Sequence, residues 1–211
     1  MKLFAIYGAG GHGKVIADTL RAVNLDFNIA IDDAKDAKLF NIKALKPQDF
    51  LKINNAKNTY SIILAIGDSK IRKELYDKFT QLGFEMPSII HPSAYISKTA
   101  TLGKGVVVLA NASIGADAKI GDGAIINTGS VVEHDCSIGE FSHIAPGAVL
   151  CGGVSVGTQT LIGARSVIIE SKSVGDSCLI GAGSVVIDSI ENNKKVVGNP
   201  AKKELTQEKK A

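Results

Sequence analysis

His134 stands between two acidic residues, Glu133 and Asp135, in the segment Glu-His-Asp-Cys. A neutral imidazole beside a carboxylate can accept a proton near pH 7, so this pattern suits a general base. The same arrangement also occurs on ordinary protein surfaces, where a histidine between acids is simply solvated. The three residues alone leave both interpretations open.

A glycine cluster near the N-terminus could bind a phosphate group. Gly8–Gly13 (GAGGHG) matches the dinucleotide-binding pattern G-x-G-x-x-G, and Asp32 follows Gly13 by nineteen residues. Read alone, the pattern favours an NAD-dependent oxidoreductase. Two features oppose that interpretation, because the unit holds only about ninety residues and no domain for hydride transfer follows it. A glycine turn at a helix N-terminus also binds the phosphates of other nucleotides.

The composition argues against several other kinds of site and partner. Cys136, Cys151 and Cys178 have no CxxC spacing, which indicates reduced thiols and no metal site. The net charge is +3 without a basic stripe interleaved with aromatics, so no nucleic acid partner is expected. We see neither a signal peptide nor an apolar stretch long enough for a membrane span, and expect a cytoplasmic protein. Lys202–Ala211 should be a solvated, frayed tail.

The glycine cluster lies in a segment, residues 1–90, whose pattern predicts alternating strands and helices. Strands are expected at 3–7, 28–31 and 61–66, and helices at 14–22 and 71–82. The buried face of the second helix should run from Ile71 through Phe79 to Leu82. This alternation predicts a small parallel α/β sheet of Rossmann-like type.

Residues 91–211 follow a different rule, with a period of six. From Ile96 to Val186 every sixth position, sixteen in a row, is Ile, Leu or Val. Four residues after each of them the chain usually carries Ala, Ser or Cys, and the exception, Lys172, predicts a loosened corner. Glycines that directly follow the aliphatic residue are expected to ease the corners. The repeat predicts a parallel β-helix with three flat faces, about five coils and a height of roughly 25 Å.

On such a β-helix, His143 follows His134 by nine residues, which is half of an eighteen-residue coil. The two histidines should therefore lie on different faces of one prism, too far apart to act together within a subunit. They could converge only where two prisms pack side by side. Read alone, His143 could also be a structural surface residue.

The second half of the chain resembles the hexapeptide-repeat acyltransferases, whose prism is left-handed. The closing segment Val197–Lys202 (VGNPAK) is similar to the G-x-P-A-K ending of that family. With the GAGGHG turn and the segment Gly129–Gly153 around His134, the resemblance covers nearly the whole chain. It narrows to sugar-nucleotide acetyltransferases of the bacillosamine, perosamine and sialic acid type.

The resemblance implies an acetyl-CoA-dependent enzyme with a Rossmann-like sugar-nucleotide domain and a left-handed β-helix, and it assigns residues to each ligand. His134 would be the general base, held by Asp135 where the bacillosamine enzyme has Glu. The sugar nucleotide would contact Gly10, Gly11, His12, Asp32, Asp33 and Gly67. The cofactor would contact His143, Gly152, Ala164 and Ala182. His143 would donate to the thioester carbonyl or help to seat the cofactor.

The family forms trimers with sites between neighbouring prisms, so we expect a homotrimer, and no metal. Cys136 and Cys178 occupy small corner positions, so transfer should be direct, without an acyl-enzyme. The expected acceptor is the 4-amino group of a UDP-linked 4-amino-4,6-dideoxy-N-acetylhexosamine. GDP-perosamine N-acetylation and O-acetylation of the sialic acid type are the alternatives within the family. A non-catalytic hexapeptide-repeat scaffold is the alternative outside it.

Overall fold

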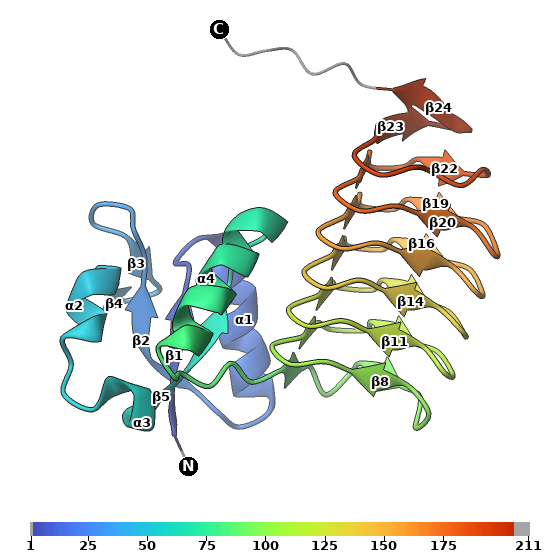
Figure 1. The fold of residues 1–211 in the computed structure, drawn as a ribbon. Helices are drawn as coiled ribbons and strands as arrows, with labels where there is room; N and C mark the ends of the chain where they lie inside the picture. Colours follow the sequence, from blue (N-terminus) through green and yellow to red (C-terminus); the bar gives the residue numbers. More distant parts are fainter. Residues whose placement is uncertain (1, 205–211) are drawn as a thin grey trace, which may run out of the picture. The chain divides into compact units, whose positions relative to one another are not determined.

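The computed structural model describes residues 2–204, so the expected tail lies outside the described residues from residue 205 onward. The chain divides into two compact units, Met1–Pro92 and Ser93–Ala211 (Figure 1). The division falls two residues after the change of pattern at residue 90. It coincides with the Pro-containing segment that follows the last strand of the first unit.

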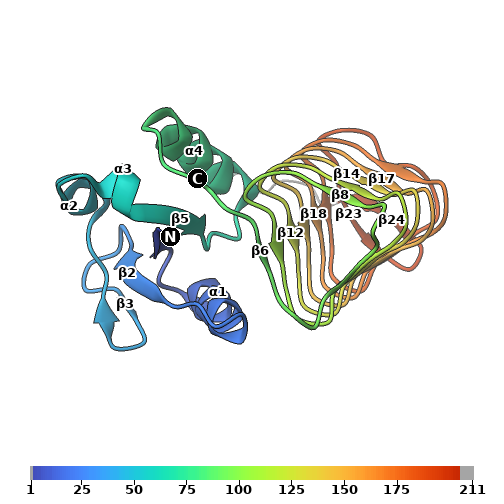
Figure 2. The same cartoon turned by 90° about the horizontal axis from the view of Figure 1, so that it is seen from below.

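The first unit is built on a three-stranded parallel sheet in the order β2-β1-β5 (Figure 2). The strands are β1 (Leu3–Tyr7), β2 (Phe27–Ile31) and β5 (Tyr60–Leu64). Helix α1 (Gly11–Ala22) connects β1 to β2, and α4 (Ser69–Gln81) follows β5. Because β2 and β5 flank β1 on opposite sides, the carboxyl ends of β1 and β5 form a topological switch point, where α/β sheets commonly bind ligands.

Shorter elements complete the first unit. They are β3 (Lys38–Leu39), β4 (Ile42–Lys43), α2 (Pro47–Leu51), α3 (Ala56–Thr59) and β6 (Ile89–Ile90). The first two form an antiparallel pair after β2, and α2 begins with a proline, whose fixed φ suits the first helical turn.

The buried face of α4 differs from the expected one. Phe79 is buried and packs edge-on against Phe84, with 5.6 Å between the ring centroids. Ile71 and Leu82, however, are 49% and 43% exposed, whereas Arg72 is only 2% exposed. Helical spacing of apolar residues cannot reveal this, because a charged side chain enters a core only where specific acceptors meet it.

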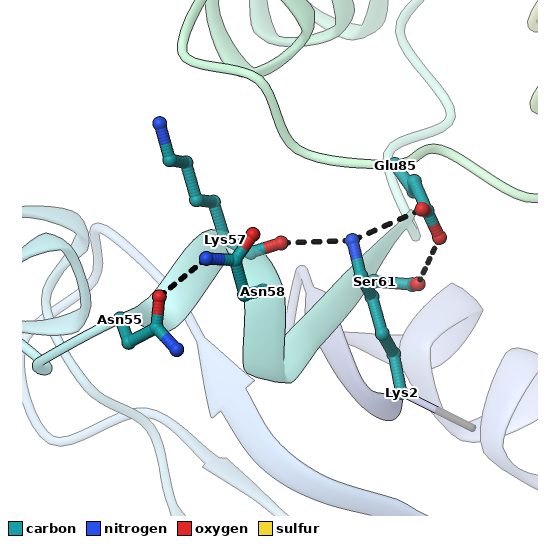
Figure 3. A network of polar contacts seen from close by, with 6 residues as sticks. All are labelled: Lys2, Asn55, Lys57, Asn58, Ser61 and Glu85. Carbon is teal, nitrogen blue, oxygen red and sulfur yellow. Dashed lines mark hydrogen bonds and ion pairs between the residues drawn. The ribbon is translucent and has the colours of Figure 1, made fainter.

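A polar network joins the amino-terminal ends of β1 and β5 (Figure 3). Lys2 Nζ donates to the backbone oxygen of Lys57 at 2.9 Å and pairs with the Glu85 carboxylate at 3.0 Å. Ser61 Oγ donates to the same carboxylate at 3.3 Å. Glu85 is largely exposed, so the pair contributes little to stability. The network instead holds the amino-terminal ends of β1 and β5 together, at the end of the sheet opposite to the glycine cluster.

The second unit is a parallel β-helix of two-residue strands. They are β7 (Tyr95–Ile96), β8 (Thr101–Leu102), β9 (Val107–Val108), β10 (Ser113–Ile114), β11 (Lys119–Ile120), β12 (Ile125–Ile126), β13 (Val131–Val132), β14 (Ser137–Ile138), β15 (His143–Ile144), β16 (Val149–Leu150), β17 (Ser155–Val156), β18 (Leu161–Ile162), β19 (Val167–Ile168), β20 (Ser173–Val174), β21 (Leu179–Ile180) and β22 (Val185–Val186). The antiparallel pair β23 (Lys195–Gly198) and β24 (Ala201–Glu204) closes the unit.

Strands eighteen residues apart stack into three faces. One face has the order β22-β19-β16-β13-β10-β7, the second β20-β17-β14-β11-β8, and the third carries β24-β23-β21-β18-β15-β12-β9 from this unit. Of the sixteen predicted aliphatic positions, fourteen are buried in one core, and Ile96 and Leu102 in the first coil pack against it. The six-residue prediction is therefore confirmed, although six strands on one face give about six turns instead of five.

The corners of the β-helix are turned by residues to which the sequence pattern did not assign this role. Each has φ near +60° and lies three places after an inward aliphatic residue. They are Gly105, Asn111, Asp117, Gly123, Gly129, Asp135, Phe141, Gly147, Gly153, Gln159, Arg165, Ser171, Ser177 and Gly183. Many are Gly, Asn or Asp, the residue types that adopt this left-handed conformation most readily.

The glycines that directly follow the aliphatic residues do not turn the corners, but lie where two coils approach each other closely. A Cβ on Gly115 would lie 2.6 Å from the backbone nitrogen of His134 in the next coil. These glycines permit close approach between coils, so the expected corner role is wrong. The loosened corner expected at Lys172 is also absent from the described residues, since Ser155 N donates to Lys172 O at 3.0 Å as in the regular ladder.

Candidate active site

His134 lies two residues after the end of β13, and its side chain is 63% exposed. Its Nδ1 lies 2.8 Å from Asp135 Oδ2. A carboxylate can only accept, so Nδ1 carries the proton and Nε2 carries the lone pair. The hydrogen bond to Asp135 raises the pKa of His134, and the negative charges of Asp135 and Glu133 act in the same direction. The arrangement is that of a histidine prepared to accept a proton at Nε2.

The backbone around His134 is held by the neighbouring coils. Asp135 has φ +59° and donates its N–H to Ala116 O at 2.9 Å, while the carbonyl of His134 accepts from Gly153 N at 2.9 Å. Asp adopts this corner conformation more easily than most residues, which gives a physical reason for the short acid next to His134.

Gly152 has a second reason to be glycine besides the predicted contact with the cofactor. A Cβ at this position would lie 2.5 Å from both Cε1 and Nε2 of His134. Atoms cannot approach so closely without displacement, so the imidazole occupies space that any other residue type would fill. The ring of His134 therefore packs directly against the backbone of Gly152.

His143 lies on β15, on a different part of the coil from the corner that carries His134. Its Nε2 is 2.9 Å from Asn127 Nδ2. The amide of Asn127 is oriented, because its Oδ1 accepts from Thr128 N at 2.7 Å. Nδ2 must then be the donor, so Nε2 of His143 carries a lone pair and the proton resides on Nδ1. The two histidines thus have the same tautomer, with the proton on Nδ1, but His134 is bonded to its partner through Nδ1 and His143 through Nε2.

Two of the three cysteines, Cys136 and Cys178, are not prepared for nucleophilic chemistry. All three are free, and Cys136 and Cys178 are buried. Burial raises the pKa of both thiols, which disfavours the reactive thiolate. Cys136 Sγ also donates to Cys151 O at 3.2 Å, as a small packed residue would.

Two of the residues predicted to contact the cofactor, Ala164 and Ala182, lie eighteen residues apart and therefore in successive coils. Ala164 is half-buried and Ala182 is exposed. The carbonyl of Ala164 already accepts from Gly183 N at 2.8 Å. Pro146 lies eighteen residues before Ala164, one coil earlier, and its carbonyl accepts from Arg165 N at 3.0 Å. A ligand could use only the second lone pair of these oxygens.

Five glycines that follow β1 and β5 separate into two groups. A Cβ on Gly8 would lie 2.5 Å from Ala65 O, and one on Gly13 would lie 2.2 Å from Gly8 O, so both glycines are required by the turn itself. Gly10, Gly11 and Gly67 have open space where a Cβ would stand. These three follow β1 and β5, at the switch point of the sheet, and leave room for a ligand to approach the backbone.

The two predicted acidic residues after β2 are engaged within the unit. Asp32 accepts from Ala9 N and Ala34 N, both at 2.7 Å. Asp33 accepts from the Tyr7 hydroxyl at 2.5 Å, and burial together with this bond raises the pKa of Tyr7. Asp32 thus ties the end of β2 to the glycine turn, and a role in ligand binding would use its remaining lone pairs.

His12 and Arg72 lie close together in the first unit. Burial lowers the pKa of His12 to about 4, and the charge of Arg72 adds to this shift. The buried Nε2 of His12 has no hydrogen-bond partner among the described residues. Nothing in the sequence pattern pointed to Arg72, nor to Asn127 in the second unit.

Two further properties concern residues 2–204 only. Within this part of the chain, no group of three or more His, Cys, Asp or Glu residues could hold a metal ion. No helix there is long and apolar enough to cross a membrane.

Two family models match the chain, and together they define its class. Residues 4–79 match the PglD N-terminal domain, and residues 99–134 and 117–152 match the bacterial transferase hexapeptide of six repeats. The chain is therefore a hexapeptide-repeat transferase with a PglD-type N-terminal domain.

Relatives narrow this class. A variant of perosamine N-acetyltransferase from Caulobacter crescentus, solved with CoA and GDP-perosamine, is 34% identical, covers 98% of each chain and has a TM-score of 0.93. The acetyltransferase domain of PglB from Neisseria gonorrhoeae is 33% identical over 96% of this chain and 99% of its own, with a TM-score of 0.89. That domain has also been solved with acetyl coenzyme A. The chain belongs to this family of hexapeptide-repeat sugar acetyltransferases.

A curated relative agrees over part of its length. UDP-N-acetylbacillosamine N-acetyltransferase of Bacillus subtilis is 36% identical over 113 residues, which is 52% of this chain and 52% of that enzyme. The matched region thus spans about half of the curated relative.

Proposed function

We propose that this protein transfers the acetyl group of acetyl-CoA to the 4-amino group of a UDP-linked 4-amino-4,6-dideoxy-N-acetylhexosamine. The observation that carries the proposal is the pairing of His134 Nδ1 with Asp135 Oδ2 at 2.8 Å, which leaves a basic Nε2 at an exposed corner. The names of the relatives support acetyl transfer to an amino sugar. We expect the reaction in the cytoplasm.

The chemistry follows from the two histidines. As the amine nitrogen attacks the acetyl carbonyl, Nε2 of His134 takes the proton that the nitrogen loses. The tetrahedral intermediate then expels the thiolate of coenzyme A, and the protonated imidazole returns its proton to the thiolate or to water. His143 would donate to the negative oxygen of the intermediate or help to seat the cofactor. Because the buried thiols of Cys136 and Cys178 are poor nucleophiles, we propose direct transfer without an acyl-enzyme.

The nucleotide and the sugar define the main alternative. The Caulobacter relative was solved with GDP-perosamine, whereas the Bacillus relative is named for a UDP-sugar. Purified protein should be incubated with acetyl-CoA and a panel of UDP- and GDP-linked amino sugars, with products followed by mass spectrometry. Acetylation of the UDP-4-amino sugar in preference to GDP-perosamine supports the proposal. The opposite preference would show that GDP-perosamine is the better substrate and would favour the perosamine reaction. O-acetylation of a sialic acid would replace it altogether.

The two units should hold different ligands, the nucleotide on the first and coenzyme A on the second. Replacing His12 by Ala should raise the Michaelis constant for the sugar nucleotide about tenfold and leave that for acetyl-CoA unchanged. Replacing Ala182 by Tyr should do the reverse, because a large exposed side chain at this position would block the proposed contact with the cofactor. Asp32→Ala should also raise the constant for the sugar nucleotide, but with a loss of thermal stability, since Asp32 holds Ala9 N at 2.7 Å. Steady-state kinetics measure the Michaelis constants of all three variants. The reversed pattern would mean that the first unit holds coenzyme A and the second unit holds the sugar nucleotide.

We also propose a homotrimer. His134 lies at a corner after β13, whereas His143 lies on β15, so a site that uses both requires a second chain. Light scattering during gel filtration should give three times the chain mass of 22.1 kDa under conditions in which the enzyme is active. A stable monomer with full activity would contradict this.

A further inference from the structure

Arg72 is a charged side chain in the core of the first unit. It is 2% exposed and lies in the first turn of α4. Its Nη1 donates to two successive carbonyls, Ile66 O and Gly67 O, both at 2.9 Å. These carbonyls belong to the short loop between β5 and α4, which forms one side of the switch point.

This position is electrostatically costly for a cation. A helix N-terminus carries a partial positive charge, which disfavours a buried guanidinium in the first turn. Burial lowers the pKa of Arg72 to about 10, and the charge of Asp68 opposes this shift. Asp68 is also the N-cap of α4, accepting from Ile71 N at 2.9 Å. An apolar residue would fill the same core volume without this cost, so the presence of Arg calls for a local reason other than packing.

That reason lies in the open space beside the loop between β5 and α4, which a ligand could occupy. Gly67 faces open space, and Gly10 and Gly11 do so after β1, the neighbouring strand. The N-termini of α1 and α4 both begin at this edge of the sheet, and Arg72 adds a full positive charge behind them. Such a region attracts an anionic ligand such as the diphosphate of a nucleotide. The guanidinium fixes the carbonyls of the loop, so the backbone of Gly67 keeps the position from which it can meet that ligand.

We infer that Arg72 is a positioning residue for the sugar nucleotide, which holds the loop between β5 and α4 in its binding conformation through the carbonyls of Ile66 and Gly67. The inference rests on the proposed function, in which the first unit holds the nucleotide. Arg72 itself is buried and does not touch the substrate. Its loss should therefore affect nucleotide affinity, with no direct effect on the acetyl transfer step.

The test compares Arg72→Met and Arg72→Lys with a matched control, Lys70→Met. Lys70 lies in the same helical turn but is exposed, so its replacement removes an equal charge without removing a buried clamp. Calorimetry with UDP, GDP and coenzyme A gives the affinities, steady-state kinetics gives the Michaelis constants and turnover, and thermal unfolding reports the fold. Arg72→Met should weaken UDP binding and raise the Michaelis constant for the sugar nucleotide by about tenfold or more. Coenzyme A affinity, turnover at saturation and the properties of Lys70→Met should be unchanged.

Arg72→Lys should be intermediate, because its ammonium keeps the charge but lacks the planar fork of the guanidinium. If Arg72→Met does not fold, Arg72→Lys decides: an intermediate rise in the Michaelis constant supports the inference, and a wild-type value overturns it. A folded Arg72→Met with wild-type UDP affinity also overturns it, as does a parallel loss of UDP and coenzyme A binding. Wild-type protein that binds coenzyme A but neither UDP nor GDP would instead refute nucleotide binding by the first unit, and the inference with it.

Discussion

Replacement of His134 by Ala should lower turnover by roughly 10²–10⁴-fold, the usual contribution of a general base. The side chain is 63% exposed, so its truncation removes little packing. The fold, the oligomeric state and coenzyme A affinity should therefore remain as in the wild type. Stopped assays of thiol release at saturating concentrations of both substrates measure the change directly.

The pH dependence of the same reaction is an independent test of His134 as the base. The base must be neutral, so kcat/KM should fall as the pH drops through the pKa of His134, which Asp135 raises. Replacing Asp135 by Asn removes the charge and lowers that pKa, so the acidic limb should move to lower pH. The maximal rate should also fall, because a less basic ring accepts the proton less readily, but by less than in His134→Ala. Asn suits the left-handed corner at φ +59°, so the backbone should be preserved.

Glu133 supplies the matched control for this experiment. It also flanks His134, but its charge is the smaller influence on the pKa of His134, and Asp135 alone is hydrogen-bonded to the ring. Glu133→Gln should shift the acidic limb in the same direction by a smaller amount. Turnover in His134→Ala close to the wild-type rate, or equal shifts in the two carboxylate variants, would contradict the assignment of the base and its partner.

The repeat was predictable from the sequence because each coil obeys the same local rule. One inward aliphatic residue every six places is enough to define the three faces, and the prediction from Ile96 to Val186 is confirmed in the core. The glycines were misinterpreted, because both a left-handed corner and a close approach between coils favour glycine. Only the coordinates distinguish Gly153, with φ +69°, from Gly115, which lies against the backbone of His134.

The site was predictable only in part. The exposed position of His134 follows from its two-residue offset from Val132, and its neighbour Asp135 is adjacent in sequence. Asn127 and Arg72 escaped notice because their partners depend on side-chain torsions and on contacts across a coil or a loop. Sequence spacing contains no information on either. For the same reason, Asp32 was assigned only to the ligand, although its carboxylate also holds the glycine turn through Ala9 N.

Replacement of Gly152 by Ala should lower turnover by about 10²-fold, the scale on which a displacement of roughly 1 Å acts on a catalytic group. The new Cβ would stand 2.5 Å from Cε1 and Nε2 of His134. The φ of Gly152 is not left-handed, so alanine fits the backbone, and the clash is with a side chain that can rotate away. The imidazole of His134 should leave its position against residue 152, while the β-helix keeps its thermal stability.

A double-mutant cycle separates this effect from the predicted contact between Gly152 and the cofactor. If Gly152 acts through the imidazole, adding Gly152→Ala to His134→Ala should change the residual turnover by less than about threefold, since the ring that it displaces is already absent. Coenzyme A affinity, measured by calorimetry, should then be the same in His134→Ala and in the double variant. If the two losses multiply and coenzyme A binding weakens in both backgrounds, Gly152 acts on the cofactor instead. The crystal structure of Gly152→Ala, with the imidazole of His134 still bonded to Asp135 at its original place, would rule out the steric account.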